Sequence, residues 1–277
     1  TDHVDSINRN GLLIEGPDGK IIAKNIKAST KILDLEGCYF YIIATKASNL
    51  AESVKNLKDK VDLSAPIITI QNGLGAGDII MKHMPKNTLI LGVAEGFGAS
   101  LIAPGHVTHT ANKKIRLGSI SQKVGEKKLE NIVSTWRSAG LKTEIYENIE
   151  QLVWEKLLCN VTLSGPCSMF GCNVKELLNN KERWAFALKC MQEAYSVGLA
   201  KGIPFSFNDP IEYVTDFAKR VGSAKPSMLQ DFETKKKTEI DFINGAIPPL
   251  AAKYKTSTPF NDHVCKIIHD AEKLIKS

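Results

Sequence analysis

The fold is decided by residues 149–165, Ile-Glu-Gln-Leu-Val-Trp-Glu-Lys-Leu-Leu-Cys-Asn-Val-Thr-Leu-Ser-Gly. Apolar residues recur at positions 149, 152, 153, 157, 161 and 163, which is helical spacing. At about 100° per residue, Lys156 falls in the middle of this apolar arc, and Asn160 and Ser164 follow on the same side. A lysine in an arbitrary helix usually extends past its neighbours to water. A lysine that stays buried costs free energy unless it is paired or used, so this inward row is the first candidate site.

The composition limits the classes of partner. A chain of 277 residues is long enough for two domains, and its 43% hydrophobic and 24% charged residues are ordinary for a globular protein. No apolar run approaches the length that spans a membrane. The net charge of +6 is modest, and the densest cluster, Lys235-Lys236-Lys237, is typical of a solvated helix face. We therefore expect neither a membrane nor a nucleic acid partner.

The six cysteines indicate a reducing compartment. They form no Cys-x-x-Cys pair, and three of them lie inside apolar runs, so the sequence predicts buried free thiols in the cytoplasm. They are Cys38, Cys159, Cys167, Cys172, Cys190 and Cys265. His106 and His109 are near neighbours, but no third ligand lies close in sequence, so we expect no metal site.

The first half of the chain alternates strands and helices. We predict a hairpin around residues 16–19, buried strands at 39–44, 66–70 and 89–93, and helices at 49–57 and 77–84. Short β-like pieces follow between 96 and 118, then a helix at 127–139 and a strand at 142–146. This alternation predicts a doubly wound parallel sheet, in which ligands sit beyond the carboxyl ends of the strands. Lys46 and Asn72 lie at two of those ends.

The second half is predicted to be all helical, with helices at 149–163, 182–202, 209–221, 227–246 and 260–275. The boundary falls near Glu147. The fold class is thus an α/β Rossmann-type dinucleotide-binding domain, N-terminally incomplete, followed by an all-helical domain. We expect residues 1–147 to form the incomplete cofactor-binding domain and residues 148–277 a substrate and dimerisation domain. Several apolar helix faces in the second domain are compatible with a homodimer.

One expected feature is missing. A dinucleotide-binding half normally opens with a strand, a Gly-x-Gly-x-x-Gly turn and a helix that holds the pyrophosphate. This chain has no such turn, its pattern begins after the second strand of such a sheet, and its first residue is Thr1. A truncated chain or a mis-assigned gene start explains this. The alternative is a catalytically dead binding or scaffold protein that has lost its phosphate loop. The first explanation is favoured because the rest of the site is intact.

A second inward group lies on the predicted helix at 227–246. Ser227 followed by Gln230 fits a capping box, which would make Ser227 an N-cap. By the same 100° stepping, Glu239 falls at the centre of an apolar arc. A carboxylate on one helix and the ammonium of Lys156 on another suggest partners in a cleft, with a buried structural ion pair as the alternative.

Three groups of residues together resemble a known family. They are Gln71-Asn72-Gly73-Leu74-Gly75, then Trp154-Glu155-Lys156-Leu157 with Asn160, and finally Ser227-Met228-Leu229-Gln230-Asp231 with Thr238-Glu239-Ile240-Asp241-Phe242-Ile243-Asn244-Gly245. They are similar to the motifs of the ketopantoate reductases (2-dehydropantoate 2-reductases), over essentially the whole chain except the family's opening segment. The resemblance implies a Rossmann domain, a helical domain, and hydride transfer from NADP or NAD to the C2 carbonyl of a small-molecule 2-keto acid.

The resemblance also implies a role for each matching residue. Lys156 would be the general acid that protonates the new alkoxide, a role that its chemistry permits. Asn72 would lie where nicotinamide and substrate meet. The remaining expected contacts are Lys46, Gly98 with Ala99, and Glu239 for the cofactor, and Asn160, Ser164 and Ser227 for the substrate.

Two departures from the family pattern concern the substrate. Ser164 stands where a second substrate asparagine is common, and Val174 stands where a further asparagine is expected, with Asn173 beside it. The Asn160-to-Cys172 run and the segment from Thr238 to Gly245 also resemble the D-mandelate dehydrogenase branch, which reduces bulky 2-keto acids and prefers NADH. A D-2-hydroxyacid dehydrogenase is therefore the alternative enzyme.

Overall fold

The structure, a computed structural model, describes residues 1–35, 37–58, 60–62, 64–85, 87–120 and 125–276. The chain divides into two compact units. The sheet unit comprises Thr1–Ala44, Ala51–Ile70 and Ile80–Ile149, and the helical unit comprises Thr45–Leu50, Gln71–Ile79 and Glu150–Ser277. Two short segments from the first half of the chain thus belong with the helices. The predicted functional division into residues 1–147 and 148–277 stays a prediction.

The sheet unit is built on one mixed sheet. Over the described residues it has seven strands in the order β2-β1-β6-β5-β4-β3, with β7 paired to β6. The strands are β1 Leu12–Gly16, β2 Gly19–Ala23, β3 Tyr41–Ile43, β4 Ile67–Thr69, β5 Leu89–Ala103, β6 His106–Ser119 and β7 Thr143–Ile145. Strands β3, β4 and β5 run parallel, as the buried apolar runs predict, whereas β1–β2 and β5–β6 are antiparallel hairpins.

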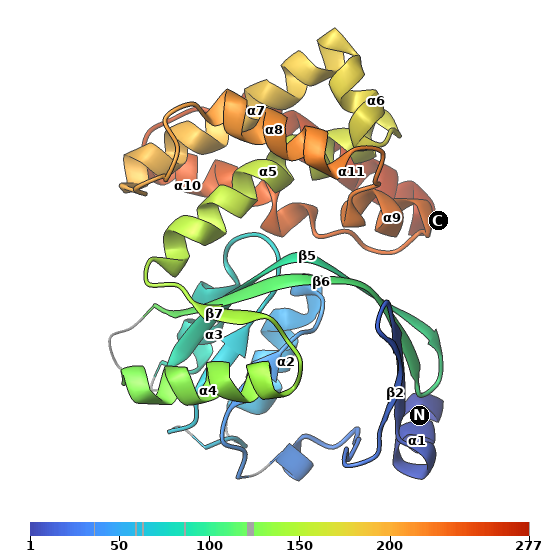
Figure 1. Cartoon of the computed structure of the whole chain (residues 1–277). Coiled ribbons are helices and arrows are strands. Elements are labelled where there is room, and N and C mark those ends of the chain that lie inside the picture. The colour runs from blue at the N-terminus through green and yellow to red at the C-terminus, as the bar shows by residue number, and fades with distance from the viewer. Residues whose placement is uncertain (36, 59, 63, 86, 121–124, 277) are drawn as a thin grey trace. The chain divides into compact units, whose positions relative to one another are not determined.

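The helices of the sheet unit follow from the same pattern. α1 (Asp2–Asn10) precedes the first hairpin, α2 (Leu50–Leu57) and α3 (Ala76–His83) connect the parallel strands, and α4 (Glu126–Ser138) follows β6. Figure 1 shows α4 beside the sheet, where its apolar residues pack against strand residues such as Ile90 and Leu117. Because Leu129, Ile132, Val133 and Trp136 recur at helical spacing, they form one buried face of α4.

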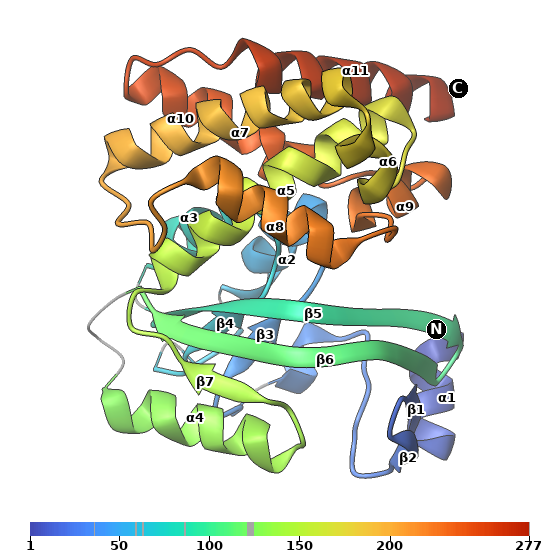
Figure 2. The same cartoon turned by 45° about the horizontal axis from the view of Figure 1, so that its top comes forward.

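The prediction of short β pieces between residues 96 and 118 is wrong. β5 and β6 are instead two long strands that form one extended hairpin, which Figure 2 shows lengthwise. Glycines that suggested breaks are accommodated inside the strand, since the register of β5 against β6 shifts between Gly98 and Ala99. The turn needs Gly105, which has φ +73° and leaves no room for a Cβ beside Ser6 Oγ.

The helical unit is organised around α5 (Ile149–Phe170), which continues beyond the predicted end at residue 163 and through Pro166. The other helices are α6 Val174–Asn179, α7 Lys181–Lys201, α8 Pro210–Val221, α9 Ser227–Glu233, α10 Ile247–Lys253 and α11 Pro259–Lys276. Most residues of α5 are buried, and Trp154, Leu158 and Val161 belong to one core cluster. A helix buried over most of its surface occupies the centre of a helical core. Among the described residues, no helix is both long and apolar enough to cross a bilayer.

The predicted helix at 227–246 is wrong. α9 ends after Glu233, Lys235 adopts a positive φ of 57°, and short 3₁₀ turns follow at Ile240–Phe242 and Asn244–Ala246. The tertiary contact of the Thr238 N–H with Glu272 Oε1, at 2.7 Å, then holds the chain in a non-helical path. The inward direction of Glu239 therefore cannot be derived from helical stepping.

The predicted capping box at Ser227 is also wrong. The N-cap of α9 is Pro226, without a side-chain cap hydrogen bond, and Ser227 is the first helical residue. Gln230 Nε2 donates instead to Lys225 O at 2.9 Å. A proline before a helix fixes φ near its required value, so this helix starts without help from the serine.

Candidate active site

The row Lys156, Asn160 and Ser164 lies in the middle of α5, where most residues are buried. Between residues 152 and 164, all of which are described, Val153, Lys156 and Asn160 are partly exposed and every other residue is buried. Spacings of three and four place these three on one stripe of α5. Lys156 is therefore partly exposed and not enclosed in the apolar core, whereas its direction towards a cleft stays a prediction. Ser164, at 5% exposure, lies further inward.

Sequence reasoning missed Glu155, the residue before the candidate acid. Its side chain is 4% exposed, and Oε1 accepts hydrogen bonds from Ser206 N at 2.7 Å and from Gln151 Nε2 at 3.0 Å. A buried carboxylate needs such donors. Glu155 therefore ties α5 to the loop after α7, and it fixes the helix turn on which Lys156 stands.

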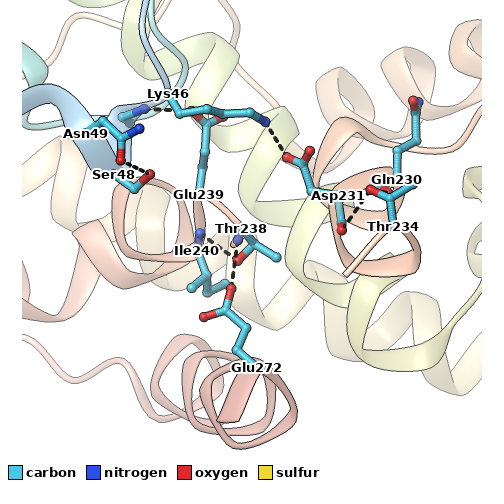
Figure 3. Close-up of polar contacts among 11 residues, drawn as sticks. Lys46, Ser48, Asn49, Gln230, Asp231, Thr234, Thr238, Glu239, Ile240 and Glu272 are labelled. Carbon is cyan, nitrogen blue, oxygen red and sulfur yellow. Dashed lines mark hydrogen bonds and ion pairs between the residues drawn. The ribbon is translucent and has the colours of Figure 1, made fainter. Parts of the chain in front are cut away.

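The second group of candidates surrounds the turn Thr45–Leu50, which follows β3 (Figure 3). Lys46 Nζ lies 2.5 Å from Asp231 Oδ2, and the backbone N–H of Ala47 donates to Glu239 Oε1 at 3.1 Å. Glu239 is buried, with 9% exposure, and Lys46 is exposed. The structure thus brings the predicted residues Lys46 and Glu239 to the same turn and adds Asp231, whose role had no sequence signal of its own.

The segment Gln71–Ile79, which follows β4, is held by the same part of the chain. The N–H of Leu74 donates to Phe242 O at 2.8 Å. Gly73 has φ +83°, and a Cβ there would lie 2.0 Å from Phe242 O, so this approach requires glycine. Gln71 Nε2 donates to Thr45 O at 2.6 Å and links the two segments. Asn72 is therefore positioned next to the Lys46 turn by residues 239–242.

The remaining predicted residues lie elsewhere. Gly98 belongs to β5 in the sheet unit, at the register shift. Ser227 is exposed at the start of α9, one turn before Asp231. The pairing of Lys156 with Glu239 stays a prediction. Among the described residues, no group of three or more His, Cys, Asp or Glu side chains could hold a metal ion.

The donor set fits one end of a nicotinamide dinucleotide. Ammonium and amide groups at Lys46 and Asn72 are suited to ribose, phosphate or carboxamide oxygens. Both follow the carboxyl ends of parallel strands, where such ligands bind in open α/β sheets. Among the residues of this sequence, no Gly-x-Gly-x-x-Gly turn is present to hold the pyrophosphate.

The cysteines are all free, but they are not all buried as predicted. Cys159, Cys167, Cys172 and Cys190 are buried, whereas Cys38 and Cys265 are partly exposed. Burial raises the pKa of the Cys159 thiol to about 12, because the thiolate would lose its hydration. Such a thiol is a poor nucleophile at neutral pH, so the candidate chemistry does not use it.

Comparison with known proteins identifies the family. The family described as "Ketopantoate reductase PanE/ApbA" matches residues 1–122, and its C-terminal part, "Ketopantoate reductase PanE/ApbA C terminal", matches residues 148–272. The 2-dehydropantoate 2-reductase of Streptococcus pyogenes serotype M1 is 26% identical over 99% of this chain and 88% of its own length. The enzyme of that name from Pyrococcus abyssi is 28% identical over 98% of this chain and 88% of its own length.

Solved structures show the same fold. A D-mandelate dehydrogenase with NADH and anilino(oxo)acetate has a TM-score of 0.87 at 23% identity, covering 100% of this chain and 89% of the other. The 2-dehydropantoate 2-reductase of Methylococcus capsulatus has a TM-score of 0.88 at 23% identity, covering 99% and 88%. This chain belongs to the ketopantoate reductase family. The predicted fold class, a Rossmann-type sheet domain followed by a helical domain, is confirmed.

Proposed function

We propose that this protein is an oxidoreductase that uses NADPH or NADH to reduce the C2 carbonyl of a 2-keto acid, as a 2-dehydropantoate 2-reductase does. The family match over both halves of the chain carries this proposal. It is supported by the turn after β3 and the segment after β4, which place Lys46 and the Asn72 region beside Glu239.

A bound nicotinamide would supply the hydride for the carbonyl carbon in the proposed reaction. Negative charge then develops on the carbonyl oxygen, and the ammonium of Lys156 stabilises this charge and donates the proton. Lys156 suits this role because it stands on the accessible stripe of an otherwise buried helix, whose position Glu155 fixes. A rigid supporting element keeps an acid within reach of its target.

The other residues are proposed to bind and orient. Lys46, Glu239 and the backbone at Gly98 would contact the cofactor, and Asn72 would lie where cofactor and substrate meet. Three residues are proposed to hold the substrate's oxygens: Asn160, which lies one turn after Lys156, Ser164 and Ser227. Asn160 offers both a donor and an acceptor to a carboxylate or hydroxyl group, whereas each serine offers a single hydroxyl.

One observation favours a second candidate substrate, a 2-keto acid with a bulky apolar side chain. Val174 is fully buried in the core, so it offers no polar group to a substrate. Neighbouring Asn173 cannot easily replace it, because its Oδ1 accepts from Glu176 N at 3.0 Å as the N-cap of α6. A site with fewer polar groups discriminates less in favour of a substrate hydroxyl. The product would then be a D-2-hydroxy acid.

The cellular compartment and the oligomeric state of the enzyme are also proposed. Six free cysteines are usual for a protein of the reducing cytoplasm. We also propose a homodimer, with which the several apolar helix faces of the second half of the sequence are compatible. Sedimentation analysis that finds only monomers at enzyme-assay concentrations would reject the dimer without affecting the catalytic proposal.

The test of function is the oxidation of NADPH and NADH by the purified protein, with and without ketopantoate, 2-ketoisocaproate and benzoylformate. Oxidation that depends on a 2-keto acid supports the proposal. Tight binding of a 2-keto acid without any turnover would support a binding protein instead. Neither binding nor turnover with any of these compounds would reject both.

A further inference from the structure

The turn Thr45–Leu50 is held at two separate points by the helical unit. Glu239 holds its backbone, through the 3.1 Å bond from Ala47 N to Oε1. Asp231 holds its side chain, through the 2.5 Å contact from Lys46 Nζ to Oδ2. The two carboxylates come from one stretch of chain, yet they act on different parts of the turn (Figure 3). The backbone and the ammonium are therefore fixed independently.

The hold on the backbone is rigid because Glu239 stands between two buried residues. Thr238 is 2% exposed and its N–H donates to Glu272 Oε1 at 2.7 Å. Ile240 is 1% exposed and its N–H donates to Thr238 Oγ1 at 3.3 Å. Glu272 belongs to α11, so this helix anchors the loop that carries Glu239 (Figure 3). Ala47, buried at 1% exposure, is thereby fixed in place.

A fixed backbone does not fix the lysine side chain. A lysine side chain has four rotatable bonds and loses much rotamer freedom when it is ordered. The side chain of Lys46 is 46% exposed, so packing does not order it. The side chain of Asp231, by contrast, is only 13% exposed, so packing restricts it. Asp231 lies in α9 just after Met228 and Leu229, which are both buried in the core. A carboxylate on a rigid helix can therefore define where a flexible ammonium lies.

We propose that Asp231 is a positioning residue, which holds the ammonium of Lys46 at the place where it meets the dinucleotide. This inference rests on the proposed function for the identity of the ligand, but the contact between the two side chains does not. Asp231 acts through Lys46 and does not touch the cofactor. Removing the carboxylate frees the ammonium, so binding of the cofactor must order it again.

The same helix offers a matched control. Glu233, two residues further along α9, forms an ion pair with Lys225 at 2.6 Å, and the two side chains are 44% and 49% exposed. This pair has a similar N–O distance and likewise joins a lysine to a carboxylate, but it has no part in the proposed site. Asp231→Asn and Glu233→Gln each remove one negative charge. Each replaces a carboxylate by an amide of nearly the same shape.

The first experiment measures the position of the ammonium without any ligand. Native protein is treated with a trace amount of acetic anhydride, and the acetylation rates of Lys46 and Lys225 are compared by mass spectrometry. Asp231→Asn is expected to raise the rate at Lys46 by about two- to five-fold, the range for a half-exposed ion pair, and to leave Lys225 unchanged. Glu233→Gln is expected to do the reverse. An unchanged Lys46 rate in Asp231→Asn overturns the proposal.

The second experiment is a double-mutant cycle on the dissociation constant for NADPH, measured by its fluorescence. Asp231→Asn is expected to weaken binding by about two- to five-fold, and to have no further effect in a Lys46→Met background. Glu233→Gln leaves binding unchanged. An effect of Asp231→Asn that persists without Lys46, or no effect in the wild-type background, overturns the proposal. If the wild type binds neither NADPH nor NADH, the proposed function fails and the acetylation rates alone decide whether Asp231 positions Lys46.

Discussion

Replacing Gly165 by alanine tests how closely α5 is packed beside the candidate site. Gly165 directly follows Ser164, and a Cβ at this position would lie 2.4 Å from Asn244 Oδ1 and 2.7 Å from Val264 Cγ1. Neither neighbour can move freely, because both are 0% exposed. Asn244 Nδ2 also donates to Val161 O at 3.1 Å and to Asn261 Oδ1 at 3.0 Å, which joins α5 to α11.

The expected change in stability is a balance of three effects. Glycine to alanine inside a helix normally stabilises by about 0.5–1 kcal/mol. Overpacking a rigid core costs about 1–3 kcal/mol. Displacing Asn244 weakens one or both of its hydrogen bonds, each worth about 0.5–1.5 kcal/mol. We therefore expect Gly165→Ala to lower the free energy of unfolding by about 1–3 kcal/mol, opposite in sign to the helix propensity.

The assay is urea unfolding followed by circular dichroism, with Gly125→Ala as the control. Gly125 is the N-cap of α4 with φ −56°, and a Cβ there would meet no atom within 4 Å. The control is expected to lower the free energy of unfolding by up to about 1 kcal/mol, because alanine is a poorer N-cap than glycine, but without any steric clash. A Gly165→Ala variant as stable as the wild type, or more stable, would refute the close approach of Asn244 and Val264 to α5.

Three further predictions follow from the site and its surroundings. Glu239→Gln is expected to weaken cofactor binding or turnover with little effect on folding, because an amide oxygen can still accept the hydrogen bond from Ala47 N. If thermal stability collapses while activity per folded molecule stays normal, Glu239 is purely structural. The enzyme is expected to have a higher kcat/KM for 2-ketoisocaproate or benzoylformate than for ketopantoate, since Ser164 and Val174 offer fewer polar groups than the asparagines of the family pattern. A clear preference for ketopantoate with NADPH would make it an ordinary enzyme of pantothenate biosynthesis. Because burial raises the pKa of Cys159 from about 9.0 to about 12, the neutral thiol contributes stability that is fully present below pH 9 and is lost as the pH rises towards 12. Cys159→Ala should reduce the fall in unfolding free energy between pH 8 and 10.5, and an unchanged slope would count against this burial effect.

The architecture was predictable from sequence wherever one periodic pattern decided the structure. β4 and the start of β5 are largely buried on both faces, so they appear as continuous apolar runs. The apolar run of β3 is instead part of an edge strand of the described sheet, in which Ile42 is exposed. The long hairpin was not predictable in the same way, because Gly96 and Gly98 suggest breaks that cross-strand pairing with β6 overrides.

The candidate site was predictable only in part. Motifs identified Lys156, but helical stepping could not give its partial exposure, because stepping assumes one apolar face and α5 is buried almost all round. Helical periodicity also failed at Glu239, where a contact with α11 sets the path of the chain. The role of Asp231 could not be predicted from the sequence, since its partner Lys46 lies 185 positions away and no local pattern links the two residues.

The account depends most directly on the role of Lys156 as the general acid. The measurement is kcat for 2-keto acid reduction by Lys156→Ala, with the exposed Lys189 in α7 changed to alanine as the control. We expect Lys156→Ala to lose a factor of about 10²–10⁴ in kcat with its circular dichroism spectrum unchanged, and Lys189→Ala to keep wild-type turnover. Wild-type turnover by folded, pure Lys156→Ala at neutral pH would contradict the account.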